Sequence, residues 1–157
     1  MPSQFEFVRK NIDCNESQTT TNLEAYIRNS NNIFMKMDIE GGEWCWLDKV
    51  SSDDLDRIKQ LVIEFHWLGD DKFCDNNIKI NVLNKLKDNF YLVHIHGNNY
   101  GHFVEDKYPY VIECTYVRKD VFESPLDFNK VSFPLSIDMP NNKEKPDYQL
   151  NYWPYVS

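Results

Sequence analysis

Glycine is scarce in this sequence and is missing from its first part. Only five of the 157 residues are glycine, and the first of them is Gly41. A G-x-G turn lets the backbone approach a ligand closely, and other residues do not easily replace it. The segment before Gly41 therefore contains no glycine-rich turn for a ligand.

Long apolar runs and an excess of positive charge are also lacking. No apolar run approaches the length that spans a membrane, and the N-terminus does not resemble a secretory signal. Lys and Arg number 17 against 25 Asp and Glu, which gives a net charge of −8. We therefore expect neither a membrane nor a nucleic-acid backbone as the main partner.

The four cysteines are widely spaced and form no CxxC motif. Cys45 and Cys114 lie in apolar segments, where we expect them to be small, buried and unpaired. The simplest setting for such a chain is the reduced cytoplasm. Abundant Asn, Ile and Lys with little Gly are typical of an AT-rich genome, such as those of some large DNA viruses.

What is present indicates one globular α/β unit with a tail. Hydrophobic residues make up 41% of the chain, enough for a real core. Strands predicted at 33–39, 61–67 and 90–96 are separated by helices predicted at 43–50 and 78–88, which favours parallel pairing. A strand at 109–117 follows without a helix, so we expect it to be antiparallel. A helix at 23–29 and a short strand at 5–9 (FEFVR) complete the prediction.

The character of the chain changes near Phe122. Five of the seven prolines fall between residues 125 and 154. Proline excludes a central strand there, and aromatic residues near the end indicate anchoring. We therefore predict a domain at 1–121 and an extended C-terminal arm at 122–157, packed on its own domain or on a neighbour.

The chain is organised around residues 33–46, IFMKMDIEGGEWCW. The apolar run is typical of a strand that is covered on both faces. Asp38 and Glu40 follow at its carboxyl end, Gly41 allows a tight turn, and Glu43 opens a helix whose dipole favours a carboxylate. Turn and helix-cap preferences alone also explain why Asp38 and Glu43 occur at these positions. A structural role and a ligand-binding role therefore both stay open for them.

Polar residues follow each of the three predicted parallel strands. In open α/β sheets, ligands bind outside the carboxyl ends of the strands. A histidine there is a natural general base, although each histidine can equally be a hydrogen-bonded structural residue. The residues that we expect in one neighbourhood are Asp38, Glu40, Glu64, His66, His94, His96, Asn98 and Asn99.

Three stretches together resemble one family. KMDIEGGEW (36–44) resembles the K-I/M-D-I/V-E-G-x-E signature of FkbM-type methyltransferases, and LVIEFHWL (61–68) and HIHGNNYG (94–101) with PYVIECTYVRKD (109–120) resemble its carboxyl half. The resemblance implies part of a Rossmann-like sheet of three parallel strands and one antiparallel strand. It also implies S-adenosylmethionine as cofactor and transfer of a methyl group to a hydroxyl, for example of a sugar or glycan.

The resemblance also assigns roles to residues. It implies that the polar residues after the central strand face cofactor and acceptor, so we assign cofactor binding to Asp38, Glu40 and Gly41. O-methylation needs a base near the acceptor hydroxyl, so we assign catalysis to Asp38 and to His66, His94 or His96. Substrate binding falls to Glu43, Glu64, Asn98 and Asn99. No metal ligand is implied.

The part of the family that should precede these motifs, with its glycine turn, is absent from this chain. The strand at 33–39 would then lack its usual neighbour, and an open edge invites pairing with another chain. FEFVR, a second copy or a partner chain could fill it.

Two other interpretations of the function stay open. One is a non-catalytic methyltransferase-like binding or structural module that dimerises. The other is a metal-dependent hydrolase, in which the His94/His96 pair takes Asp38, Glu40 or Glu64 as a third ligand.

Overall fold

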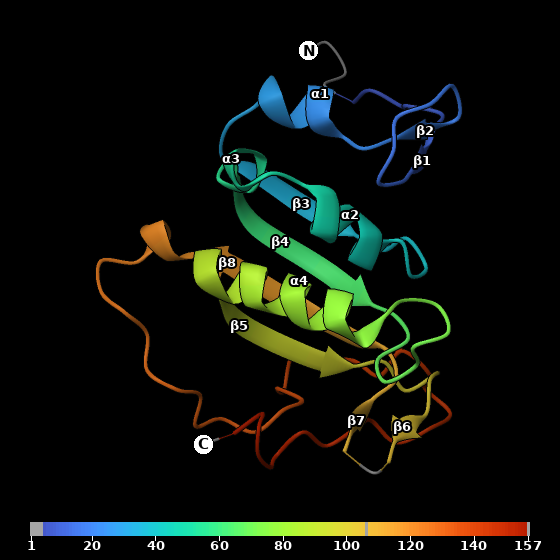
Figure 1. Ribbon diagram of the computed structural model, residues 1–157. Coiled ribbons are helices and arrows are strands. Elements are labelled where there is room, and N and C mark those ends of the chain that lie inside the picture. Colours follow the sequence, from blue (N-terminus) through green and yellow to red (C-terminus); the bar gives the residue numbers. More distant parts are fainter. Residues whose placement is uncertain (1–4, 106, 157) are drawn as a thin grey trace.

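The computed structural model describes residues 5–105 and 107–156, and a mixed four-stranded sheet lies at its centre (Figure 1). The strand order is β3 (Ile33–Met37), β4 (Ile58–Phe65), β8 (Ile112–Arg118) and β5 (Phe90–Gly97). β3 and β4 are parallel, and β8 is antiparallel to both of its neighbours. β3, β4 and β5 therefore all point the same way. The predicted α/β class with three parallel strands and one antiparallel strand is confirmed.

The remaining elements are short, apart from one helix. The helices are α1 (Glu24–Arg28), α2 (Glu43–Lys49), α3 (Ser52–Leu55), α4 (Asn76–Asn89) and the 3-10 helix η1 (Lys119–Val121). The strand pairs are β1 (Asn11–Ile12) with β2 (Thr20–Thr21), and β6 (Phe103–Val104) with β7 (Tyr108–Pro109). In the described ranges, no helix combines the length and apolar character needed to cross a membrane.

The core lies between the sheet and the two helices α2 and α4, which Figure 1 shows on one face of the sheet. Alternate residues of β4 point into it, among them Leu61, Ile63 and Phe65. The ring of Trp44 on α2 stacks on Phe65 with centroids 4.5 Å apart. This packing fixes where α2 begins relative to the end of β4.

The opposite face of the sheet is polar and is partly covered by the C-terminal arm. Glu113 on β8 lies directly between Glu64 on β4 and His96 on β5. Within 122–156, the only strand-type pairing described is the bridge between Phe133 and Leu150, both of which are buried. Asp138 and Asp147 of the arm contact His94 and His96 on β5, so the arm packs on its own sheet, as one of the two alternatives predicted. The division at residue 121 stays a prediction.

The structure corrects two predictions for the N-terminal half. β3 is not covered on both faces, because Phe34 is 64% exposed and Lys36 is also exposed. Among the described residues, β3 pairs only with β4 and is an edge strand. FEFVR forms no strand, and the side chains of Phe5 and Phe7 are exposed.

The prediction for Cys45 is also wrong. Cys45 lies on the exposed side of α2 and forms a disulfide with Cys14. The two inward positions beside it are taken by Trp44 and Trp46, both almost fully buried. Cys114 is buried and unpaired, as predicted. The pairing removes the cysteine argument for a reduced compartment.

Candidate functional site

Glu43 and His66 form a buried pair at the carboxyl edge of the sheet. Glu43 is the first residue of α2 and is 0% exposed. Its Oε1 accepts a hydrogen bond from the backbone N of Ile39 at 3.0 Å and lies 3.0 Å from Nδ1 of His66. A carboxylate only accepts, so Nδ1 carries the hydrogen and the neutral ring keeps its lone pair on Nε2.

Nε2 of His66 faces three further carboxylates. It lies 3.5 Å from Glu40 Oε2, 3.9 Å from Glu64 Oε2 and 4.0 Å from Asp38 Oδ1. We call Asp38, Glu40, Glu43, Glu64 and His66 the His66 cluster. It is assembled from the end of β3, the start of α2 and the end of β4, as parallel strands dictate.

Burial and charge shift the proton affinities in the cluster. Glu64 is buried, and this burial together with the charge of Asp38 raises its pKa, although a hydrogen bond from Asn98 at 2.7 Å opposes the shift. Burial lowers the pKa of His66, but the hydrogen bond to Glu43 and the charges of Glu43, Glu64 and Glu40 outweigh it and raise the pKa overall. The cluster thus holds excess negative charge around one imidazole.

The backbone beside the cluster has an unusual conformation. Gly41 has φ +99°, and a Cβ there would lie 2.1 Å from the ring of Trp67, so only glycine fits. Glu40 and Trp67 also have positive φ, 55° and 61°, although neither is glycine. Such conformations are costly and gather at functional sites. The tight turn predicted at Gly41 is confirmed.

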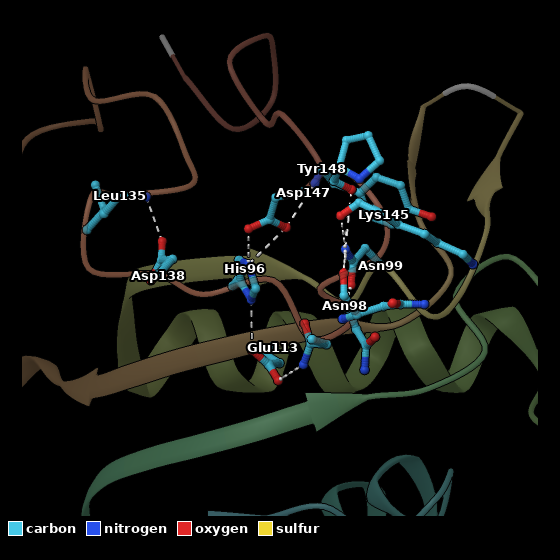
Figure 2. Close-up of polar contacts among 12 residues, drawn as sticks. His96, Asn98, Asn99, Glu113, Leu135, Asp138, Lys145, Asp147 and Tyr148 are labelled. Atoms are coloured by element: carbon cyan, nitrogen blue, oxygen red, sulfur yellow. Dashed lines mark hydrogen bonds and ion pairs between the residues drawn. The ribbon is translucent and has the colours of Figure 1, made fainter.

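His96 is enclosed by carboxylates on both sides (Figure 2). Its Nδ1 lies 3.0 Å from Glu113 Oε2, and its Nε2 lies 2.9 Å from Asp147 Oδ2 in the arm. The hydrogen bond to Glu113 outweighs burial and, with Asp147, raises the pKa of His96 to about 9. His96 is therefore a protonated link between sheet and arm.

His94 and Asn99 also hold the arm. Nε2 of His94 lies 2.9 Å from Asp138 Oδ1, and Asp138 in turn accepts from the backbone N of Leu135. The amide of Asn99 donates to backbone carbonyls of the arm, including that of Lys145, and its oxygen accepts from the N of Asn142. Figure 2 draws the contact of Asp138 with Leu135 and the contacts of Asn99 with the arm. His94 and Asn99 both connect the sheet side of the molecule to the arm.

A cavity of about 450 Å³, lined by apolar side chains such as Val62 and Met139 and by several polar ones, lies between the sheet face and the arm. Its lining includes Lys36, His94, Glu113, Thr115 and Asp138. Lys36 also lies 3.6 Å from Asp38, so the cavity adjoins the His66 cluster. Both charge signs and a hydroxyl line it, which suits a ligand with several hydroxyl groups.

The structure brings together part of the predicted set. Asp38, Glu40, Glu43, Glu64, His66 and Asn98 meet in or beside the His66 cluster. His94, His96 and Asn99 instead contact the arm.

Sequence reasoning missed Asp138 and Asp147, which lie 44 and 51 residues from the histidines they contact. Buried histidines need hydrogen-bond partners, and the arm was one segment that could supply them. This is the only signal in the sequence that pointed to these two residues.

Comparison with known proteins gives no assignment: no family model matches the chain, and neither curated proteins nor solved structures yield a significant match.

Proposed function

We propose that this chain is the acceptor-binding part of an FkbM-type O-methyltransferase that uses S-adenosylmethionine. The observation that carries the proposal is the His66 cluster. The two best motifs of the resemblance, KMDIEGGE and EFH, come from separate strands, yet their polar residues meet around His66 Nε2. A sheet of three parallel strands and one antiparallel strand is also what the resemblance implies.

The acceptor hydroxyl would bind at the His66 cluster. A hydroxyl must lose its proton as the methyl group arrives, so a lone pair or charge at the site is needed. Nε2 of His66 offers that lone pair because Glu43 holds the other nitrogen. Both ring nitrogens of His96 and one of His94 are engaged by carboxylates. Of the three predicted histidines, His66 is thus best placed.

The mixed polar and apolar lining of the neighbouring cavity supports a sugar or glycan as acceptor. It lies beside Asp38 and is lined by groups that donate and accept hydrogen bonds, including Lys36, Thr115 and Asp138. A substrate with several hydroxyls pairs with such a surface.

In this proposal, the cofactor pocket is completed by residues that this sequence does not contain. This chain has no glycine before Gly41, and the roles of Asp38, Glu40 and Gly41 in cofactor binding stay a prediction. β3 is hydrogen-bonded on one side only among the described residues, and Asp38 and Glu40 follow directly after it. We place the missing half of the pocket against this edge.

Methyl transfer tests the proposal. The chain is purified from its source organism under mild conditions, so that a partner accompanies it, and is assayed with radiolabelled S-adenosylmethionine and glycan acceptors. His66→Gln should lower transfer about 100-fold or more, as loss of acid–base catalysis does, whereas His94→Gln should retain it. Absence of transfer in the wild type, or equal transfer by both variants, would contradict the proposal.

A non-catalytic binding module that dimerises is the second candidate. The half-exposed β3 with Phe34 on its open face favours it. Light scattering across concentrations decides: a dimer that Phe34→Lys dissociates, without methyl transfer, supports the module, and a monomer at every concentration counts against it. Phe7→Lys, also at an exposed phenylalanine, is the control.

The metal-dependent hydrolase that would use His94 and His96 as ligands finds no support in the structure. Both ring nitrogens of His96 are held by carboxylates, so neither is free to bind a metal.

A further inference from the structure

We infer that Asp38, Glu64 and His66 bind a divalent transition-metal ion. One carboxylate oxygen from each acid and one ring nitrogen lie within 4.8 Å of one another. Metal–ligand distances in such sites are about 2.0–2.2 Å, so two ligands of one ion lie at most about 4.4 Å apart. The distances from Nε2 of His66 to Glu64 and to Asp38 are 3.9 and 4.0 Å. They are too long for hydrogen bonds and fit a shared ion.

The orientation of His66 is an independent sign of a ligand. The side chain is 9% exposed, and the contacts described for its Nε2 are ion-pair distances of 3.5–4.0 Å to Glu40, Glu64 and Asp38. Buried polar atoms normally have partners. Glu43 holds Nδ1 as carboxylates commonly hold metal-binding histidines, and its own Oε2 is buried without a partner in the described structure.

The charges around the cluster favour a cation. Asp38, Glu40, Glu43 and Glu64 all approach one imidazole, and Glu43 and Glu64 are buried. Buried carboxylates are costly unless they are paired or coordinate a metal. Lys36, at 3.6 Å from Asp38, is the one lysine or arginine with a described ion pair to these four acids. Two ligating carboxylates balance the charge of a divalent ion.

The mixed ligand set favours a particular class of ion. Imidazole suits Zn²⁺, Fe²⁺ and related ions, whereas Mg²⁺ and Ca²⁺ prefer oxygen ligands alone. Glu40, whose side chain is 85% exposed, can approach as a fourth ligand. The open side of the ion would take water or, if the proposed function holds, the acceptor hydroxyl.

Calorimetric titration of the full-length, chelator-treated chain with Zn²⁺ and with Mn²⁺ tests the site. We expect a single site in the wild type, its loss in His66→Gln and Asp38→Asn, and unchanged affinity in His94→Gln. Glu43→Gln should weaken binding about 10–100-fold, because Glu43 orients His66 without touching the ion. Circular dichroism checks that each variant is folded. If His66→Gln does not fold, the affinity of Asp38→Asn decides the test, because Asp38 is half-exposed and its replacement should disturb the fold less.

Three results would overturn the inference. They are no binding at millimolar ion, a single site that persists in both Asp38→Asn and His66→Gln, and binding lost in His94→Gln but kept in His66→Gln. Because no S-adenosylmethionine is present, the titration does not depend on methyl transfer. Metal binding without transfer contradicts only the proposed function, and transfer without metal binding contradicts only this inference.

Discussion

Glu43 decides how His66 can act. A carboxylate at the start of a helix has an ordinary explanation in the helix dipole, and from the sequence alone that explanation was as good as a functional one. The structure shows Glu43 fully buried, between the backbone of Ile39 and the ring of His66. Its burial results from the packing of α2 against β4, which the residues around Glu43 do not encode locally.

Replacing Glu43 should therefore affect stability strongly. Glu43→Ala leaves the N–H groups of Ile39 and His66 without their acceptor, which should cost about 3 kcal/mol in the free energy of unfolding. Glu40→Ala is the matched control, since that side chain is 85% exposed, and should change it by less than about 0.5 kcal/mol. Urea denaturation measures both. Equal losses in the two variants would show that Glu43 is not the buried anchor described.

At the level of elements, most of the regular structure follows from the sequence. Helices predicted at 43–50 and 78–88 occur as Glu43–Lys49 and Asn76–Asn89, and the four strands predicted after residue 32 occur with shifted ends. Apolar periodicity carries this information. It does not say whether one face of a strand or both faces are covered, which is why β3 was expected to be covered on both faces. The contacts of the arm with the sheet could not be predicted from the sequence either, because they join residues far apart in the chain.

The link between β5 and the arm should weaken at high pH. The folded state raises the pKa of His96 from 6.5 to about 9, chiefly through Glu113 and against burial. A raised pKa stabilises the fold fully below the unfolded pKa of 6.5, and the stabilisation is lost as pH rises through about 9. The free energy of unfolding of the wild type, measured relative to His96→Gln, should fall by about 2 kcal/mol across this window.

Denaturation at several pH values between these limits measures that difference. A difference between the two proteins that stays constant, or that grows with pH, would rule out His96 as a protonated link. Because other groups titrate in the same window, the comparison with His96→Gln is needed to isolate this one.

The Cys14–Cys45 disulfide attaches the N-terminal loop to α2 across 31 residues. Closing a loop of this size restricts the unfolded chain, so Cys14→Ser should cost about 3 kcal/mol. Cys74→Ser, at an unpaired cysteine, should cost much less. Thiol titration of the denatured, unreduced protein should find two of the four cysteines, and four reactive thiols would contradict the pairing.

For the whole molecule, the direction of the strands predicted half of the site. Asp38, Glu64 and His66 were expected together because parallel strands end at the same edge of a sheet, and they do meet. His94 and His96 end at the same edge but are taken up by the arm. Strand direction places side chains along an edge, but competing carboxylates elsewhere in the chain decide which of them stay available.

We propose that this chain supplies one part of a methyltransferase site and does not contain the whole cofactor pocket. The most direct test is calorimetric titration of S-adenosylhomocysteine into the chain alone and into the complex purified from its source organism. We predict micromolar binding by the complex and none by the chain alone at millimolar ligand. Binding by the chain alone would show that its pocket is complete, and a complex that does not bind would contradict the methyltransferase account.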